Sequence, residues 1–354
     1  MTNPMLPGNL PVGRRIRNRY QVVGYLGGGA NGRVYEVWDE WQNQRCALKM
    51  LNSTNFGTWA EATVLTSLHG DYILPILNTD EEAGVPFIVT KVLENGCTED
   101  HIVSGVGVPV DQAAEWVRQA AVGIARVHDT GLVHMDIKTG NLFLDDDHRV
   151  LVGDFGLSNQ MNANGIALAG GGSPETMAPE IAAGQLATVR TDVYSLGATL
   201  YHLLAGDWLN PALRPISDWN QLMAAVAAHG TPRPLGEVAP HVPVGLRAII
   251  MKAIDPDPAK RYATADEFAA AIGARSRPTR TWTRDLPCTG HTTCFTGTKA
   301  GASTLKVCAV PTGNRGRHVI ESHRVPAGRR INPWPEATAA QLASKLSGHL
   351  RQLG

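Results

Sequence analysis

The chain has 354 residues, of which 43% are hydrophobic and 18% charged, and its formal net charge is zero. This is the composition of an ordinary globular protein, and the length predicts two domains or three lobes. The sequence has no run of 18 apolar residues and no signal-peptide core near its start, and its five cysteines do not suggest a disulfide scaffold. We therefore expect a cytoplasmic protein that does not enter a membrane.

The charges are unevenly distributed along the chain. Residues 1–273 contain 19 Lys and Arg against 29 Asp and Glu, a formal charge of −10. Residues 274–354 contain 13 Lys and Arg against 3 Asp and Glu, a formal charge of +10. A basic module of this kind either meets a polyanion or folds back on its acidic neighbour.

The first predicted element is a glycine-rich turn between two strands. Residues 1–19, rich in Pro and Gly and then basic, are expected to be a flexible lead-in. After them, apolar residues flank a cluster in which Gly27, Gly29, Gly32 and Val34 fit the pattern G-x-G-x-x-G-x-V. The segment that follows alternates like a strand and does not resemble a helix. This favours a flap over bound phosphates rather than a dinucleotide-binding turn.

A strand, a short helix, a second strand and a long helix follow in order. The strand over 44–51 carries Ala47 and Lys49, and Glu61 stands at the start of the next apolar stripe, which has helical spacing. A buried-type strand then leads into a turn through the run Thr90, Lys91, Val92 and Leu93. Residues 109–130 form an amphipathic helix whose apolar face indicates a core element.

Two groups of polar residues stand on either side of a predicted hairpin. The hairpin consists of the apolar runs LFL and VLV, joined by the turn-forming DDDH. Asp136, Lys138 and Asn141 precede it and Asp154 follows it, so the hairpin brings these side chains close together. Two carboxylates, an amide and an ammonium converging on one point are what Mg²⁺-assisted phosphoryl transfer needs.

These motifs, in this order, resemble those of bacterial eukaryotic-like (Hanks-type) Ser/Thr protein kinases over roughly residues 20–273. The strongest is HxDxKxxN, beginning at His134, with DFG following 13 residues after Asn141. The resemblance implies an α+β, bilobal protein-kinase fold. It would have an N-lobe with an antiparallel sheet and helix αC, a mostly helical C-lobe and, in this chain, a small C-terminal β+α module.

The resemblance also implies a catalytic set of four residues. Lys49 would contact the α- and β-phosphates of ATP and would pair with Glu61. Asp136 would accept or orient the proton of the substrate hydroxyl, and Lys138 would contact the γ-phosphate.

ATP and Mg²⁺ (or Mn²⁺) are the cofactors that the resemblance implies, with Asn141 and Asp154 as metal ligands. The glycines would cover the phosphates, Val34 would lie against the adenine, and Thr90 would be the gatekeeper before a three-residue hinge. The implied ATP-binding set is Gly27, Gly29, Gly32, Val34, Ala47, Lys49, Thr90, Lys91, Val92, Leu93, Asn141, Phe143 and Asp154.

Three supporting interactions are implied outside these sets. The hydroxyl of Ser173 would link the catalytic aspartate to the catalytic lysine. Glu180 would pair with Arg261 in a buried ion pair, and Asp192 would accept hydrogen bonds from the backbone of the catalytic loop, which runs from His134 to Asn141.

One position departs from the family pattern. Met135 stands where most family members have an arginine, which often receives an activation-loop phosphate. Without that cation, such gating loses its main partner. The segment QMNANGIALAGGG also contains no Ser, Thr or Tyr. We therefore expect activity that is largely independent of activation-loop phosphorylation.

The chain changes character after residue 273. We predict a basic linker over 274–284 and a small basic domain over 285–354, with three short strands and a helix. Docking on the acidic kinase domain or on a protein partner is favoured over nucleic-acid binding, because no recognition motif is present. The nucleic-acid alternative would use Arg315, Arg317, Arg324, Arg329 and Arg330.

A zinc site is the second open question in this domain. Cys288, His291, Cys294 and Cys308 are possible ligands. Their spacing is not that of a known zinc finger, and small β domains often bury cysteines, so both interpretations stay open.

The sequence thus predicts an ATP-dependent serine/threonine protein kinase that autophosphorylates and acts on protein substrates. One alternative is a pseudokinase-like, nucleotide-binding regulatory scaffold with a polyanion-binding basic tail, and the complete catalytic set argues against it. Another is a kinase for small-molecule hydroxyls. Ser173 and the APE segment that follows it, both typical of protein kinases, weigh against that alternative.

Overall fold

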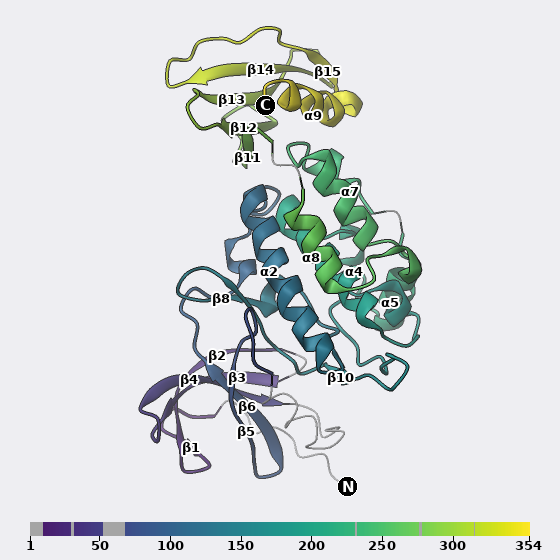
Figure 1. Ribbon diagram of the computed structural model, residues 1–354. Helices are drawn as coiled ribbons and strands as arrows, with labels where there is room; N and C mark the ends of the chain where they lie inside the picture. The colour runs from purple at the N-terminus through teal and green to yellow at the C-terminus, as the bar shows by residue number, and fades with distance from the viewer. Residues whose placement is uncertain (1–9, 30–31, 52–67, 231, 276–277, 315) are drawn as a thin grey trace.

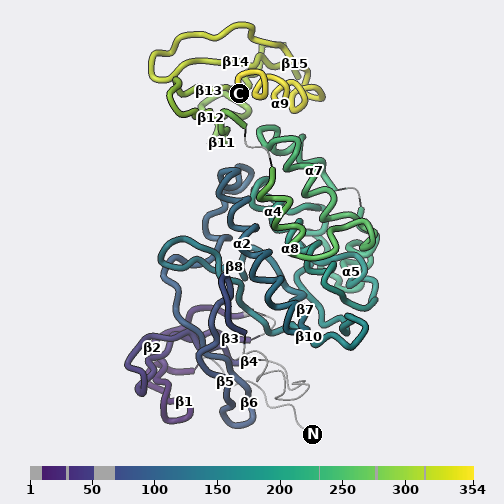
Figure 2. Tube along the Cα trace, viewed as in Figure 1, coloured from purple at the N-terminus to yellow at the C-terminus, as the bar shows by residue number. Residues whose placement is uncertain are grey.

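A computed structural model describes residues 10–29, 32–51, 68–230, 232–275, 278–314 and 316–354 (Figure 1). Three parts follow one another along the chain: a sheet lobe, a helical lobe and a small C-terminal domain. The helical lobe lies between the other two parts (Figures 1 and 2).

The sheet lobe is one antiparallel sheet with strand order β1-β2-β3-β4-β6-β5. Its strands are β1 (Arg15–Ile16), β2 (Tyr20–Gly29), β3 (Gly32–Asp39), β4 (Gln44–Leu51), β5 (Ile76–Glu82) and β6 (Val85–Lys91). Side chains alternate across β4, where Cys46, Leu48 and Met50 are buried in the core of the lobe. The strand–turn–strand prediction for the glycine cluster is confirmed, because β2 pairs with β3 up to Gly29 opposite Gly32.

The prediction of a flexible lead-in over 1–19 is wrong for its second half. Strand β1 pairs with β2, and Ile16 is only 1% exposed in the core of the lobe. Arg14 and Arg17 form ion pairs with Glu82 at 3.1 Å and Asp80 at 2.9 Å on β5. These two arginines therefore fasten the segment to acidic side chains of β5. The helix predicted after β4, with Glu61, lies outside the described residues.

The helical lobe is built around α2 (Val110–Asp129) and α4 (Val189–Ala205), which contact each other. The predicted apolar face of α2 is confirmed as core, and α4 is buried from Thr191 to its end. The other helices are α3 (Pro179–Ala182), α5 (Trp219–Ala227), α6 (Leu235–Val238), α7 (Val244–Ala253) and α8 (Ala265–Gly273). Short 3₁₀ helices span Thr98–His101, Thr139–Asn141, Pro211–Leu213 and Pro258–Lys260.

Two short strand pairs also belong to the helical lobe. Their strands are β7 (Leu132–Val133), β8 (Leu142–Leu144), β9 (Val150–Val152) and β10 (Asn159–Gln160). One strand of each pair, β7 and β9, contacts α2. The predicted hairpin is confirmed, because β8 pairs with β9 in antiparallel register, Leu142 opposite Val152. The hairpin thus holds the two polar groups of the sequence at one end of the helical lobe.

The C-terminal domain is a five-stranded antiparallel sheet in sequential order with one helix packed on it. Its elements are β11 (Thr281–Asp285), β12 (Thr293–Thr298), β13 (Thr304–Pro311), β14 (Arg317–Val325), β15 (Glu336–Thr338), a 3₁₀ turn (Ala339–Gln341) and α9 (Leu342–Gln352). Three strands and the helix match the prediction. Strands β11 and β15 were missed, and the linker predicted over 274–284 is wrong from Thr281 onward, because Trp282 on β11 is buried in the core.

The C-terminal domain contacts the helical lobe at several points. The Thr281 hydroxyl on β11 donates a hydrogen bond of 3.4 Å to the Asp111 carboxylate on α2. The Arg284 guanidinium donates a hydrogen bond of 2.8 Å to the carbonyl of Val238. The rings of His241 and Phe295 lie 5.5 Å apart, centroid to centroid. Within the part of the chain that the structure describes, no helix has the length and apolar character to cross a membrane.

Candidate active site

A cavity of about 850 Å³ lies between the sheet lobe and the helical lobe. It brings together most of the predicted site residues: Gly27, Gly32, Val34, Ala47, Lys49, Thr90, Lys91, Val92, Leu93, Asp136, Lys138, Asn141, Phe143 and Asp154. Of the remaining two predicted residues, Gly29 lies at the end of β2, and Glu61 is outside the described residues.

The glycine hairpin forms one wall of the cavity. Gly32 has a φ of 146°, and a Cβ atom at this position would clash with the backbone carbonyl of Met50 on β4. Only glycine allows β3 to begin so close to β4. Val34 and Ala47, on the paired strands β3 and β4, line the same cavity with apolar surface.

The opposite wall carries a hydrogen-bonded chain of polar groups. The Lys138 ammonium donates to Ser173 Oγ at 2.6 Å, and the Ser173 hydroxyl donates to Asp136 Oδ1 at 2.7 Å. The Asn141 amide nitrogen donates to the backbone oxygen of Asp136 at 2.7 Å and to its Oδ2 at 3.0 Å. The predicted bridging role of Ser173 is confirmed. Asp136, only 2% exposed, is fixed in one orientation.

Lys49 and Asp154 form an ion pair across the cavity, from β4 to the DFG segment. Burial alone would raise the pKa of the Asp154 carboxyl, but the adjacent Lys49 ammonium outweighs burial and lowers this pKa below its ordinary value. Asp154 therefore stays ionised and ready to meet a cation. Its backbone has a φ of 58°, an uncommon conformation for a non-glycine residue.

Buried hydrogen bonds from the helical lobe hold the catalytic loop in place. The carboxylate of Asp192 on α4 accepts hydrogen bonds from the backbone amides of His134 and Met135, both at 2.8 Å, as predicted. Burial alone would raise the pKa of Asp192, but His128, at 2.8 Å, contributes to lowering it. The His134 ring lies 3.0 Å from the carbonyl oxygen of Gly153 and 5.0 Å from the ring of Phe155, joining the loop to the DFG segment.

The segment between the DFG motif and α3 packs on the catalytic loop. Gly172 has a φ of 141°, and a Cβ atom there would lie 2.8 Å from the carbonyl oxygen of Met135. Ala167 and Ala187 exchange two backbone hydrogen bonds of 2.9 Å, which fasten the segment to the start of α4. Backbone packing therefore fixes this segment at the position where the family arginine is replaced by Met135.

The predicted buried ion pair between α3 and the end of the lobe is confirmed. Arg261 donates two hydrogen bonds to the Glu180 carboxylate, at 2.7 and 2.8 Å. Its side chain is fully buried, and Nε also donates to the carbonyl of Asp255 at 2.7 Å.

Several residues that line the cavity were missed by the sequence analysis: Leu26, Leu74, Ile76, Ile88, Cys97, Asp100, Leu157 and Trp219. The apolar ones carry no signal that separates them from core residues. Cys97 was overlooked because it belongs to no motif. The pKa of the Cys97 thiol is raised to about 11, mainly by burial and secondly by a hydrogen bond to Asp100. A thiol with this pKa is a poor nucleophile at neutral pH.

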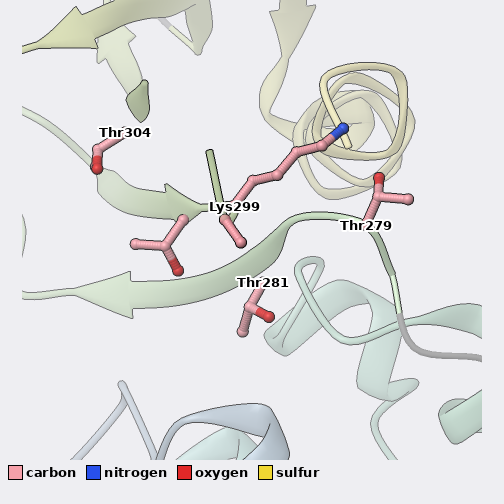
Figure 3. Close-up of a pocket in the computed structure, with 6 residues that line it drawn as sticks. Thr279, Thr281, Lys299 and Thr304 are labelled. Carbon is pink, nitrogen blue, oxygen red and sulfur yellow. The ribbon is translucent and has the colours of Figure 1, made fainter. Parts of the chain in front are cut away.

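A second hollow of about 390 Å³ lies on the C-terminal domain (Figure 3). Lys299 and the hydroxyl side chains of Thr279, Thr281 and Thr304 stand around it. This lining contains none of the residues of the predicted sites.

Comparisons with known proteins agree with the cavity and its motifs. The family model described as protein kinase domain matches residues 20–271. The chain is 30% identical to serine/threonine-protein kinase PrkC of Bacillus subtilis over 273 residues, which cover 74% of this chain and 41% of PrkC. It is 26% identical to serine/threonine-protein kinase PknA of Mycobacterium tuberculosis over 94% of this chain and 80% of PknA. The chain thus spans about two fifths of the length of PrkC, the first of these relatives.

Proposed function

Because the chain belongs to the protein kinase domain family, we propose that it is a serine/threonine protein kinase that transfers the γ-phosphate of ATP to Ser or Thr hydroxyls of proteins. The observation that carries the proposal is the hydrogen-bonded chain Lys138–Ser173–Asp136, with distances of 2.6 and 2.7 Å. It fixes an ammonium beside a buried carboxylate at the wall of the cavity. The carboxylate can accept the proton of an incoming hydroxyl while the ammonium offsets charge on the phosphate.

The cavity suits a nucleotide. Val34, Ala47 and Phe143 supply apolar surface for a flat base, and the hinge from Lys91 to Leu93 supplies backbone groups at its edge. Lys49 lies at the end of the cavity that holds Asp154. Its ammonium is therefore available to the phosphates, as is that of Lys138 on the opposite wall.

The donor set also fits Mg²⁺ or Mn²⁺. The amide nitrogen of Asn141 is committed to Asp136, which leaves the Asn141 amide oxygen to face a cation. Asp154 offers an ionised carboxylate. Oxygen donors of this kind are what Mg²⁺ prefers, and the bound ion would neutralise charge on the phosphates during transfer. Asn141 and Asp154 would hold the ion.

We further propose that this kinase is not strongly gated by phosphorylation of its activation segment. Support comes from Met135, which is apolar and buried, and from the backbone packing of Gly172 over it. A phosphate would find no guanidinium at position 135. We expect phosphatase treatment to leave most of the activity intact, and a large loss would contradict the proposal.

We propose that the basic C-terminal domain stays docked on the helical lobe. Two hydrogen bonds between the domain and the lobe support this, from Thr281 to Asp111 at 3.4 Å and from Arg247 to Ser347 at 2.9 Å. Nucleic-acid binding has weaker support, because Arg317 faces Glu336 at 3.5 Å and the Arg330 guanidinium lies 3.5 Å from the centroid of the Trp334 ring.

We also propose a cytoplasmic location, on the evidence of the cysteines. All five are free thiols. Cys294 and Cys308 are cross-strand neighbours that remain unbridged, which fits a reducing compartment.

The test is a phosphotransfer assay with labelled ATP and Mg²⁺ on wild type and Asp136→Asn. We expect the variant to lose about 10²–10⁴-fold in rate, the usual contribution of a positioned acid or base. Asp147→Asn, an exposed aspartate in the β8–β9 turn, is the matched control and should keep full activity.

Phosphosite mapping then decides the acceptor. Label on Ser or Thr of this chain, lost in Asp136→Asn, would support both autophosphorylation and the serine/threonine assignment. ATP binding without any transfer by wild type would overturn the kinase proposal.

A further inference from the structure

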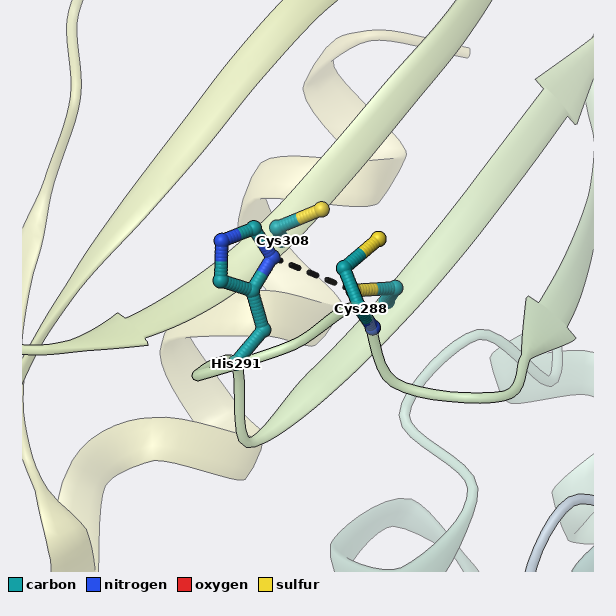
Figure 4. Close-up of side chains that lie close together, drawn as sticks. Cys288, His291 and Cys308 are labelled. Carbon is teal, nitrogen blue, oxygen red and sulfur yellow. Dashed lines mark hydrogen bonds between the residues drawn. The ribbon is translucent and has the colours of Figure 1, made fainter.

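Four metal-ligating side chains gather at one end of the C-terminal sheet, far along the chain from the phosphotransfer residues (Figure 4). Cys288, His291, Cys294 and Cys308 each offer one ligand atom, and these atoms all lie within 4.8 Å of one another. Two of the thiols are buried and stand opposite each other, Cys294 on β12 and Cys308 on β13. The other two ligands come from the loop between β11 and β12.

That loop is folded so that both of its ligands point to the same place. The backbone amide of His291 donates to the carbonyl of Cys288 at 2.9 Å, which closes a four-residue turn. Gly290, the third residue of the turn, has the φ of 80° that a type II turn requires. His291 Nδ1 then lies 3.5 Å from Cys294 Sγ, and the Cys288 amide donates to the same sulfur at 3.4 Å.

The spacing of these atoms is close to that of a tetrahedral zinc site. Zn–S bonds are about 2.3 Å and Zn–N bonds about 2.0–2.1 Å long, so ligand atoms in a tetrahedron stand roughly 3.4–3.8 Å apart. The upper limit of 4.8 Å in this cluster exceeds that by about 1 Å. Small side-chain rotations, with no change of strand register, would close the difference.

We propose that Cys288, His291, Cys294 and Cys308 bind one structural Zn²⁺ ion. On binding, the three thiols release three protons and coordinate as thiolates, and neutral His291 coordinates through the Nδ1 lone pair. The four protein ligands fill the tetrahedron and leave no open position for a substrate, which is the pattern of a structural site. Three thiolates and a neutral imidazole on Zn²⁺ would give the occupied site one net negative charge.

A Cys294–Cys308 disulfide is the competing interpretation of the two buried thiols. It would explain the cross-strand pair but not why Cys288 and His291 converge on the same point. A disulfide would give the turn at Gly290 no role. A zinc ion would use both Cys288 and His291, the two residues at the ends of that turn.

The proposed ion would tie the β11–β12 loop to the centre of the sheet. Strand β11 is the sheet edge that reaches the helical lobe, where Arg284 donates to the Val238 carbonyl. Removal of zinc should therefore loosen β11 and lower the thermal stability of the C-terminal domain more than that of the kinase lobes.

The first test is the zinc content of the purified full chain, measured by elemental analysis after growth with added zinc. We expect one zinc per chain in wild type and loss of zinc in Cys288→Ser and Cys308→Ser. Cys97→Ser, a cysteine of the nucleotide cavity, is the matched control and should keep the ion.

A second test does not depend on folding of the variants. The wild-type chain, stripped of metal and titrated with Co²⁺, should develop the visible bands of tetrahedral cobalt together with sulfur-to-cobalt charge transfer. The proposal would be overturned if the wild-type chain contained no zinc as purified and also gave no such bands with Co²⁺. A Cys294–Cys308 disulfide would overturn it as well. Intact mass spectrometry of protein freshly purified under reducing conditions would reveal this disulfide as a chain two hydrogens lighter than the fully reduced one.

Discussion

Ser173 places a single hydroxyl between two charged groups of the active site, and its removal should affect turnover rather than nucleotide binding. Ser173→Ala deletes hydrogen bonds to the Lys138 ammonium and to the Asp136 carboxylate. Such bonds contribute about 1.5–3 kcal/mol, so we expect kcat to fall by roughly 10–100-fold with little change in KM for ATP.

Ser173→Thr retains a hydroxyl and should restore most of the turnover. Steady-state kinetics of both variants, with exposed Ser217→Ala as control, check this prediction. An alanine variant as active as wild type would show that the bridge has no catalytic importance.

His241 should make folding stability sensitive to acid. It is buried against Phe295, its Nδ1 has no hydrogen-bond partner among the described residues, and burial lowers the pKa of its ring to about 3. The unfolded chain, with a histidine pKa near 6.5, therefore binds the proton more readily than the folded protein. Stability is lost as the pH falls from about 6.5 toward 3, at about 1.4 kcal/mol per pH unit from this group.

Urea denaturation of wild type and His241→Leu between pH 7 and pH 5 measures this slope. His202, whose pKa burial lowers to about 4, contributes in the same direction in both proteins. The leucine variant should therefore show a shallower pH dependence, not a flat one. Equal slopes in the two proteins would contradict the assignment to His241.

At the scale of elements, one ion pair fastens α3 to the far end of the helical lobe. Removing one partner leaves the other charge buried and unpaired, which costs about 3–5 kcal/mol. We therefore expect Arg261→Ala to lower the free energy of unfolding by that amount, measured by urea denaturation. Neighbouring Lys260→Ala, whose exposed ammonium lies 3.9 Å from Asp257, should change it by less than about 0.5 kcal/mol.

The double variant Glu180→Leu with Arg261→Met tests the reason for this loss. It removes both charges and should recover much of the stability. If the double variant were as unstable as Arg261→Ala, packing rather than the unpaired charge would be the cause.

Elements with strong local patterns could be predicted from the sequence, and those defined by distant partners could not. The hairpin β8–β9 has alternating apolar residues and a turn sequence, and its flanking motifs fix its place. Strand β11 lies in a basic, proline-containing stretch and owes its existence to pairing with β12 and to burial of Trp282. Thr281, Trp282 and Thr283, all residue types that favour strands, were the signal that pointed to a strand there.

The same contrast applies to the site. Asp136, Lys138, Asn141 and Asp154 could be identified because spacing along the chain is enough to define their motifs. The apolar lining from Leu74, Ile88 and other residues depends on how the two lobes face each other, and one sequence holds no pattern for it. Strand β1 was missed for another reason: it is only two residues long, Arg15–Ile16, and carries no alternating pattern of its own.

At the scale of the whole molecule, the docked arrangement of the C-terminal domain should respond to charge reversal at its contact with α2. Asp111→Arg removes the acceptor of the Thr281 hydroxyl on β11 and places a cation against a basic domain, so we expect it to weaken docking by about 1 kcal/mol. Small-angle scattering should show a larger radius of gyration and a larger population of undocked molecules.

Two variants make this prediction specific. Asp147→Arg changes the net charge equally at an exposed site away from the contact and should leave the radius unchanged. Combining Asp111→Arg with Thr281→Asp places opposite charges across the contact and should restore the compact form. An unchanged radius for Asp111→Arg would show that this contact does not hold the domain.

The connection between α8 and β11 is so short that the interface between the C-terminal domain and the helical lobe need not be strong. Only seven residues separate Gly273 from Thr281, so the domain can move no more than roughly 25 Å from its anchor. A tether of this length holds the two surfaces at an effective concentration in the millimolar range. An interface too weak to hold two separate polypeptides together would still keep the domain docked in this chain. A single proteolytic cut between α8 and β11 would remove the tether and release the domain.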